Sequence, residues 1–331
     1  MNIDLHSSPW HEGERAMQAR VGAADQLAAL GPRIVRDFMP DQHRSFFAQL
    51  PFMVAGSLDE AGRPWASVLA APPGFAHSPD AHHLRIDALA AAGDPLSAAL
   101  VVGAPIGLLG IEPQTRRRNR MNGVVSEIDA RGFTVEVRQS FGNCPRYIQA
   151  REPVFVDKGP SACEVRRMDR LDAAGRRIVE QADTFFIATA HPSTGDGEAS
   201  HGIDVSHRGG RPGFVRVARD GTLTAPDFNG NTFFNTLGNI ALNPRAGLLF
   251  IDFETGDLLQ LAVRTDVVWD GAELAAFEGA ERLLRMQVVS VLHRPAALAL
   301  RWGRAEPSPF LAGTGTWAEV ARLNENAGSA H

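Results

Sequence analysis

The stretch from Gly202 to Phe253 decides the fold that we expect for this chain. It contains, in order, the segments GIDVSHRGG (202–210), PGFVRV (212–217), PDFNGN (226–231), TFFNTLGNIAL (232–242) and GLLFIDF (247–253). The pattern predicts a strand, a glycine-rich turn, a strand, an Asn/Gly turn, an amphipathic helix and a strand. Backbone N–H groups at such turns and at a helix start attract anions, and the strands can form walls for a flat ring.

Composition limits the class of protein. The chain has 331 residues, 44% hydrophobic and 21% charged, which fits one large or two ordinary globular domains. A net charge of −5 argues against nucleic acid as a partner. No basic segment followed by an apolar run opens the sequence, and no apolar run approaches ~18 residues, so we expect a soluble, cytoplasmic protein that does not enter a membrane. Cys144 and Cys163 are expected to be free thiols.

Lysine is nearly absent, and this narrows the chemistry. Lys158 is the only lysine, in a turn-like link between two halves of the sequence. A Schiff-base enzyme is therefore disfavoured. A phosphate or carboxylate on a ligand would be met by arginine, backbone N–H groups or hydroxyls.

The sequence also indicates an internal duplication. Short β-like runs with Gly/Pro punctuation begin at Phe52 and predict a barrel or sandwich. The same order returns in the second half: Gly74 and Gly213 lie in matching Pro-Gly-Phe segments 139 residues apart, and Gly107 and Gly247 begin matching strands 140 apart. We expect a helical N-terminal segment (1–50, with helices at 12–30 and 41–49), a first barrel (51–160), a helical connector (161–182, its helix at 163–182), a second barrel (183–310) and a C-terminal tail (311–331).

Two copies of one barrel can pack about a pseudo-twofold axis and hold a ligand between them. In the second copy, Asn231 is expected to cap a helix over 232–242 whose first turn carries Asn235 and Thr236. A cap without any ligand is the alternative. The upstream turn residues Ser206, His207 and Arg208 favour a bound anion.

In the first copy, four arginines occur within five positions. On a strand, Arg116, Arg118 and Arg120 would share one face and Arg117 would lie on the other. They could grip a phosphate, or they could protect a solvated edge strand. His11, Glu12 and Glu14 are interpreted as a solvated helix start, and the remaining histidines lack metal-ligand spacing, so no metal is expected.

Residues 204–253 resemble the FMN-binding split-barrel family of the pyridoxamine 5'-phosphate oxidase-related proteins. RRNRMNG (117–123), which includes Asn122, is similar to that family's Arg-Gln-x-Arg-x-x-Gly strand. Gly230-Asn231, Asn235-Thr236 and Asn243-Pro244 resemble its Thr-Asn, Ser-Arg-Lys and Asn-Pro series. The resemblance covers roughly residues 40 to 305. It implies two tandem split β-barrels with flanking helices, a mainly β (α+β) fold packed as an internal pseudo-dimer.

The resemblance also implies a function. FMN would bind between the barrels and carry electrons to or from a small-molecule substrate or an electron-transfer reductase. Trp65 and Ser67, with the region of Phe214, would shape the wall beside the ring. An FMN-dependent oxidoreductase is the leading hypothesis, in a monomeric pseudo-dimer or a homodimer. A non-catalytic flavin, deazaflavin or haem binding protein of the same fold is the alternative.

Overall fold

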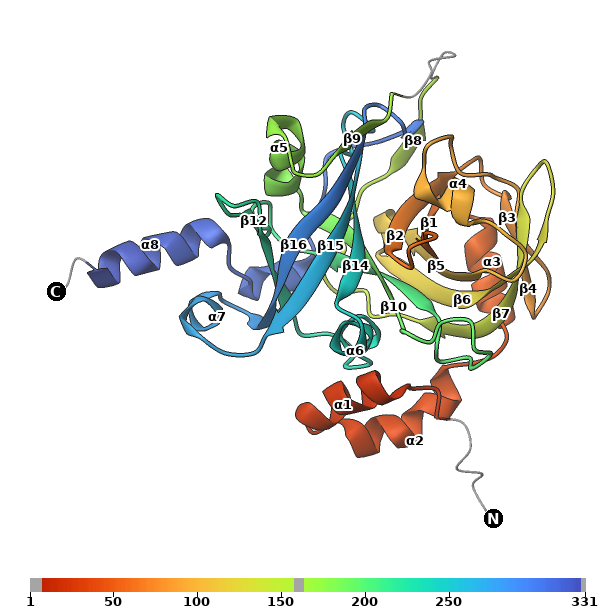
Figure 1. Cartoon of the computed structure of the whole chain (residues 1–331), viewed down its shortest axis with the longest axis horizontal. Helices are drawn as coiled ribbons and strands as arrows, with labels where there is room; N and C mark the ends of the chain where they lie inside the picture. The colour runs from red at the N-terminus through yellow and green to blue at the C-terminus, as the bar shows by residue number, and fades with distance from the viewer. Residues whose placement is uncertain (1–7, 158–163, 329–331) are drawn as a thin grey trace.

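The computed structural model describes residues 8–157 and 164–328. Lys158 and Cys163 lie outside the described residues. Two large antiparallel β-sheets make up most of the molecule, with a few helices around them (Figure 1). The expectation of a mainly β protein is therefore confirmed.

The first sheet contains the strands between Phe52 and Gly142. Its order is β2-β1-β5-β6-β7-β4-β3, an open path in which the end strands β2 and β3 are not paired with each other. Among the strands that the structure describes, neither large sheet closes into a barrel. The strands of the first sheet are β1 (Phe52–Leu58), β2 (Pro64–Ala70), β3 (Ala76–Asp80), β4 (His83–Ile86), β5 (Pro105–Glu112), β6 (Arg117–Ile128) and β7 (Phe133–Gly142).

The second sheet has the order β11-β10-β14-β15-β16-β13-β12. When strands are numbered within each sheet, both orders read 2-1-5-6-7-4-3. The strands are β10 (Thr184–Ala190), β11 (Ile203–Gly209), β12 (Arg216–Val217), β13 (Leu223–Phe228), β14 (Arg245–Ile251), β15 (Leu258–Val268) and β16 (Ala280–Arg294). Strand β9 (Arg166–Met168) pairs with β16, and β8 (Pro153–Phe155) pairs with β17 (Leu300–Trp302). The two large sheets share one topology.

Matching glycines bring the two sheets together. A Cβ atom added to Gly107 on β5 would lie 2.3 Å from the carbonyl oxygen of Ile203 on β11. A Cβ atom added to Gly247 on β14 would lie 2.4 Å from the carbonyl oxygen of Pro64 on β2. Each sheet thus places a glycine against the backbone of the other sheet, where no side chain would fit.

Each half has its own apolar core, and a third core joins the halves. Phe47 and Phe133 are buried in the first half, as are Phe185 and Phe250 in the second. The joining core draws on both sheets, with Phe52, Val54, Leu109, Phe186, Val205 and Leu249 among its buried members. Burial of this shared apolar surface holds the two sheets in one arrangement.

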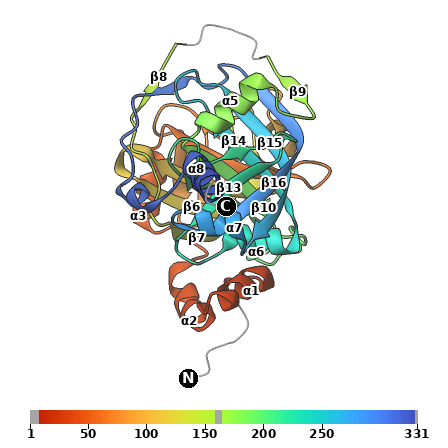
Figure 2. The ribbon, with the colours of Figure 1, turned by 90° about the vertical axis from the view of Figure 1, so that its left-hand side faces the viewer.

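The helices lie around the sheets (Figures 1 and 2). Among the described residues, no helix has the length and apolar character needed to cross a bilayer. The helices of the described chain are α1 (Glu12–Arg20), α2 (Ala24–Ile34), α3 (Asp41–Ala48), α4 (Pro95–Ala99), α5 (Ala173–Gln181), α6 (Asn235–Leu242), α7 (Ala272–Ala276) and α8 (Trp317–Gly328). Short 3-10 turns lie at Pro113–Thr115 and Pro309–Gly313.

Several expected helix boundaries are wrong. The expected single helix over 12–30 is divided into α1 and α2, because Gly22 takes φ 72° and turns the chain. Pro32 does not stop α2 but lies inside it. In the part of the connector that the structure describes, 164–182, the helix is limited to Ala173–Gln181.

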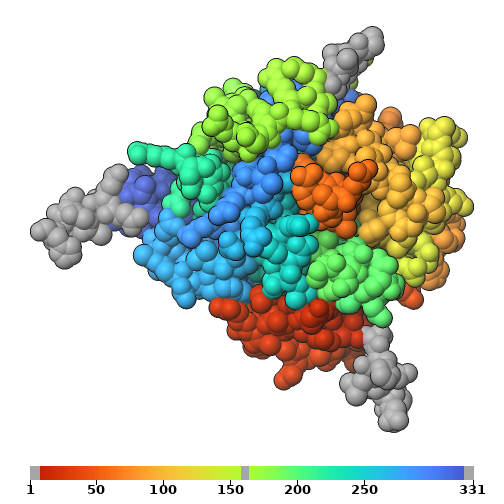
Figure 3. Space-filling view, in the orientation of Figure 1, coloured from red at the N-terminus to blue at the C-terminus, as the bar shows by residue number. Residues whose placement is uncertain are grey.

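Helix α6 begins later than expected. Phe234, with φ 63°, is its N-cap residue in place of Asn231. Figure 3 shows the segment of α1 and α2, in red, lying against segments of the second half of the chain.

Candidate functional site

A pocket opens between the two halves of the chain. Strand β6 of the first sheet contributes to one side, and β11, β13 and the start of α6 contribute to the other. Its empty volume is about 900 Å³, part of which is open solvent. A pocket at an interface between halves is a usual place for a cofactor. The polar side chains that line it include Arg118, Arg120, Asn143, Arg146, Tyr147, Ser206, His207, Arg208, Asp227, Asn229, Asn231, Thr232, Asn235, Thr236 and Arg282.

The structure gathers most of the residues that the sequence indicated. Eight of them line this one pocket: Arg118, Arg120, Ser206, His207, Arg208, Asn231, Asn235 and Thr236. They come from β6, from β11, from the loop before α6 and from the first turn of α6. The remaining four, Trp65, Ser67, Arg116 and Asn122, do not line it.

Arg116 and Asn122 lie beside the pocket for different reasons. Arg116 follows a 3-10 turn with φ 55°, so it precedes β6 instead of alternating along it. Its guanidinium contacts the carboxylate of Glu306 at 2.8 Å. Asn122 is on β6 but buried behind Arg120, where its Nδ2 donates to Asp204 Oδ1 at 2.7 Å.

Trp65 and Ser67 belong to the opposite side of the interface between the sheets. The indole N–H of Trp65 donates to Asp59 at 3.0 Å. The hydroxyl of Ser67 donates to Asp94 at 2.5 Å, within a fully buried polar group. Neither residue forms a wall of the pocket.

Most arginines of the pocket are balanced by carboxylates. Arg120 pairs with Asp204 at 2.9 Å. Arg208 and Arg282 both pair with Asp227, at 2.8 Å and 3.1 Å. These ion pairs fix the guanidinium groups in place and reduce the charge that they present to a ligand.

Arg118 is different. It donates to two backbone carbonyls, Cys144 O at 2.7 Å and His207 O at 3.2 Å. Within residues 8–157 and 164–328, no carboxylate lies within ion-pair distance of it. Burial, with the positive charges of Arg208 and Arg120 nearby, lowers the pKa of Arg118 to about 9. An anion in the pocket would stabilise this cation.

The start of α6 adds further donors. No side chain caps this helix, so the N–H groups of its first turn lack the partner that a cap provides. The hydroxyl of Thr236 donates to Ser206 Oγ at 3.0 Å, and Arg120 also donates to that oxygen. Hydroxyl, guanidinium and helix-start groups thus converge at one end of the pocket.

Backbone strain is concentrated at the same place. Five non-glycine residues in the described chain have positive φ, and three of them line the pocket: Tyr147 at 65°, Thr232 at 59° and Phe234 at 63°. Such conformations cost free energy and persist only where the surroundings hold them. Their clustering supports a functional role for this pocket.

His207 is buried on β11 and contributes a neutral imidazole. Burial, reinforced by Arg118, Arg208 and Arg151, lowers its pKa well below the usual range. Its Nδ1 has no hydrogen-bond partner among the described residues. Its ring packs edge-on against Phe186, whereas the side chains of Ser206 and Arg208 reach Thr236 and Asp227, so the imidazole lies on the other face of β11 from those two groups.

Sequence reasoning missed several lining residues. Arg282 comes from β16, and Arg146 and Tyr147 come from the loop after β7. Gly142, Asn143 and Pro145 favour a tight turn there, but such residues do not show which strand the turn faces. The sequence could not predict that Arg282 lines the pocket, because its position depends on the pairing of β16 with β13.

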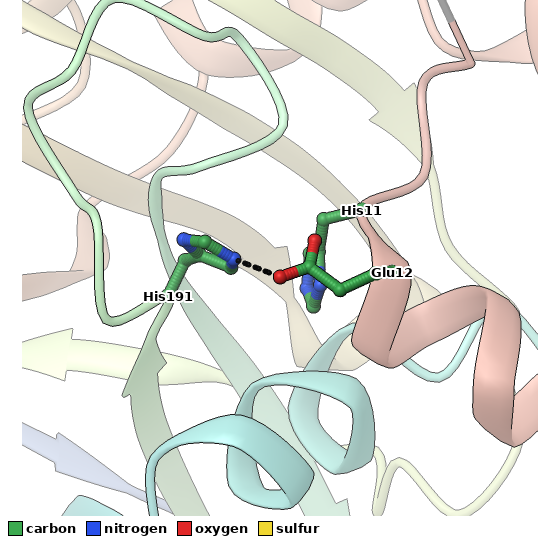
Figure 4. Close-up of side chains that lie close together, drawn as sticks. All are labelled: His11, Glu12 and His191. Atoms are coloured by element: carbon green, nitrogen blue, oxygen red, sulfur yellow. Dashed lines mark hydrogen bonds and ion pairs between the residues drawn. The ribbon is translucent and has the colours of Figure 1, made fainter.

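A second polar cluster lies at the start of α1, where His11, Glu12 and His191 come together (Figure 4). Their potential ligand atoms lie within 4.8 Å of one another. However, His11 Nδ1 accepts the N–H of Gly13, and His191 Nδ1 accepts the N–H of Ser193, both at 3.1 Å. In a neutral imidazole this leaves the proton on Nε2, so each Nε2 is a donor and not a metal ligand. His191 Nε2 accordingly donates to Glu12 at 3.2 Å.

Comparisons with known proteins give a limited result. No family model and no curated protein matches the sequence. Solved structures that match include a point variant of HupZ from Group A Streptococcus, with 13% identity over 37% of this chain and 98% of that chain, at a TM-score of 0.29. A candidate pyridoxamine 5'-phosphate oxidase from Lactobacillus delbrueckii matches with 14% identity over 38% and 94%, at a TM-score of 0.28. HutZ, the heme storage protein of Vibrio cholerae, matches with 14% identity over 38% and 95%, at a TM-score of 0.26. At these TM-scores the likeness carries no inference about what this chain binds.

Proposed function

We propose that this chain is a duplicated split-barrel protein that binds FMN in the pocket between its halves and acts as an FMN-dependent oxidoreductase. The shared strand order and the reciprocal contacts of Gly107 and Gly247 support the duplication. The position of the pocket at the junction of the two halves supports a cofactor there.

The observation that carries this proposal is Arg118, a partly buried cation that has no carboxylate partner among the described residues. A phosphate fits this position because Ser206, Thr236 and the start of α6 offer further donors. Arg118 would bind the phosphate directly, and Arg120, already held by Asp204, would orient Ser206 toward it.

The remaining lining suits a flat ring. Leu109, Phe228, Phe234 and Leu237 give the pocket an apolar part. When bound, a flavin supplies the electron-transfer chemistry, so the protein needs to provide position and electrostatics. Among the lining residues, Tyr147 and Asn143 carry side-chain groups that could exchange hydrogen bonds with the ring. The partner in electron transfer would be a small molecule or a reductase.

Haem binding without turnover is the second candidate, and His207 favours it. Its neutral imidazole is buried on β11 with Nδ1 unpartnered among the described residues, and it would have to turn away from the ring of Phe186 to reach a haem in the pocket. A neutral histidine nitrogen is a common axial ligand of haem iron. The arginines would then meet the propionates.

Titration of the purified chain with FMN, followed by flavin fluorescence and absorbance, tests the proposal. The variant Arg118→Ala should weaken FMN binding by about 10- to 100-fold, because a charge-assisted hydrogen bond contributes ~1.5–3 kcal/mol. Arg117→Ala is the matched control, since Arg117 is on the same strand but exposed, over the ring of Phe46.

Three outcomes separate the candidates. Equal FMN affinity of the Arg118→Ala and Arg117→Ala variants would contradict the phosphate assignment. A Soret band with added haemin, lost in His207→Ala, together with no FMN binding would favour haem. Bound FMN that NAD(P)H or another donor reduces, and an acceptor reoxidises, would support the oxidoreductase over a flavin carrier.

A further inference from the structure

We propose that each chain holds a single phosphate-bearing ligand, because the place in the first half that corresponds to the pocket is occupied by the chain's own Asp94 carboxylate. The identity of the pocket ligand rests on the proposed function. The observation that Asp94 fills its own site in the first half does not depend on the proposed function.

Strand register relates the two places. Ser67 on β2 pairs with Ala55 in the same way that Ser206 on β11 pairs with Ile187. Ala55 in turn pairs with Leu108, and Ile187 pairs with Leu248. Each of these leucines directly follows one of the matching glycines, Gly107 and Gly247. Likewise, Arg120 lies opposite Leu109 as Gln260 lies opposite Leu249. The serines are therefore counterparts, and so are Arg120 and Gln260.

In the first half, the site that corresponds to the pocket contains an anion from the chain itself, the Asp94 carboxylate. Asp94 Oδ1 accepts from the hydroxyl of Ser67 at 2.5 Å, and Asp94 Oδ2 lies 3.0 Å from the guanidinium of Arg294. The amide of Gln260 donates to Ser67 at 3.2 Å and to Asp94 at 3.4 Å. The side chains of Asp94 and Arg294 are 1% and 2% exposed. Serine hydroxyl, amide and guanidinium thus surround a carboxylate in a closed site.

The second-half place lacks this carboxylate. Phe234 lies 140 positions after Asp94, the offset that also relates Gly107 to Gly247. Both residues are the N-cap positions of helices that lie between corresponding strands, α4 and α6. The side chain of Asp94 accepts the N–H of Leu96, whereas no side chain caps α6. The second half has its own carboxylate, Asp204, which pairs with Arg120, but no side chain caps α6. An anion at the start of α6 must therefore come from outside, whereas Asp94 already supplies one at the start of α4.

Two measurements test this inference. First, FMN bound at saturation, counted by absorbance against protein concentration and by native mass spectrometry, should be one per chain. Second, the variant Asp94→Ala should leave Arg294 buried without its partner and lower the midpoint of thermal unfolding by roughly 5–10 °C. Formate, or inorganic phosphate, should recover much of that loss at constant ionic strength, whereas chloride should not.

The controls make the second result specific. Asp59→Ala removes another carboxylate of the first half, one whose partner Arg63 is 43% exposed, and formate should not recover its stability. The double variant Asp94→Ala/Arg294→Met should lose the response to formate, because it lacks the cation.

Several results would overturn the inference. Two FMN molecules per unaltered chain would do so whether or not any Asp94 variant folds. A folded Asp94→Ala chain that responds equally to formate and chloride would also do so. Failure of the unaltered chain to bind FMN would reject the proposed function instead, while the response of Asp94→Ala to formate would still report on the buried site.

Discussion

His11 links the charge of one buried side chain to the stability of the fold. It is 3% exposed, and its Nδ1 caps α1 by accepting the N–H of Gly13. Burial lowers its pKa from 6.5 to about 4. The unfolded chain therefore binds a proton more readily than the folded chain does. The contribution to stability is complete above about pH 6.5 and is lost as the pH falls toward 4.

The variant His11→Asn should reduce this pH dependence. Asparagine keeps a side-chain acceptor for the N–H of Gly13 but cannot be protonated. Between pH 7.5 and 5, the free energy of unfolding should fall by about 2 kcal/mol more in the unaltered chain than in the variant. Urea unfolding at the two pH values measures the difference. Equal losses would show that His11 does not carry this proton linkage.

At the scale of single residues, the sequence predicted some of the residues that line the pocket. Alternation along a strand predicted that Arg118 and Arg120 share a face, and the structure places both in the pocket. The same argument failed for Arg116, because a 3-10 turn delays the start of β6 by one residue. Trp65 and Ser67 were assigned to a ring wall, but Ser67 belongs to the counterpart site that Asp94 fills. No local pattern distinguishes the open site from the filled one.

At the scale of the element, α1 and α6 pack closely at two glycines. A Cβ atom on Gly13 would lie 2.3 Å from the carbonyl oxygen of Gly238, and one on Gly238 would lie 2.6 Å from the N of Glu14. Glu14 is buried there and accepts hydrogen bonds from His11 N and Asn235 Nδ2. Its burial raises its pKa well above the usual range. Helix α1 therefore holds the first turn of α6 beside the pocket.

The variant Gly13→Ala should be destabilising, although alanine normally favours a helix over glycine. The added methyl group would push α1 away from α6, at a cost of about 1–3 kcal/mol. Because Asn235 and Thr236 line the pocket, FMN affinity should fall as well. Thermal unfolding and FMN titration measure the two effects.

Gly303→Ala is the control, since nothing lies within 4 Å of the added atom. Stabilisation by Gly13→Ala would mean that the two helices are not in close contact.

The sequence predicted that α6 exists but not where it begins. Its apolar spacing indicated a helix from Thr232, with Asn231 as the cap. Instead, Thr232 and Phe234 take left-handed backbone conformations, and the helix starts at Asn235. Non-glycine residues adopt such conformations only when the surrounding structure holds them, so local propensity could not reveal them. The contact of Gln18 with the carbonyl of Phe233 is one such tertiary restraint.

At the scale of the whole molecule, the two sheets meet through Gly107 and Gly247, and each should be sensitive to a single added methyl group. Gly107→Ala and Gly247→Ala would place a Cβ atom within 2.4 Å of a backbone carbonyl of the other sheet. Each should lower the free energy of unfolding by about 2–3 kcal/mol. Gly202→Ala, which has open space around it, should be neutral. Chemical denaturation compares the three, and an equal stability of all would contradict the close packing of the sheets.

The sequence predicted the mainly β architecture and the equivalence in position of these glycines, because short apolar strands and their spacing are local signals. It could not predict the strand order, in which β5 lies beside β1 although three strands separate them in the chain. Nor could it place α1: the pattern around His11 and Glu14 indicated a solvated helix start, but both residues are buried, and Glu14 lies against α6. Long-range contacts of this kind are decided by which surfaces fit, and a linear pattern does not contain that information.

The partnership of α1 with α6 has a consequence for synthesis on the ribosome. Glu14 and Asn235, which are hydrogen bonded in the folded chain, are 221 positions apart. At translation rates of about 5–20 residues per second, α1 leaves the ribosome roughly 10–40 s before α6 does. During that interval the face of α1 that carries Gly13 lacks α6, the helix that covers it in the folded chain. The nascent chain must carry this face unprotected, or shielded by a chaperone, until nearly three quarters of the protein has been made.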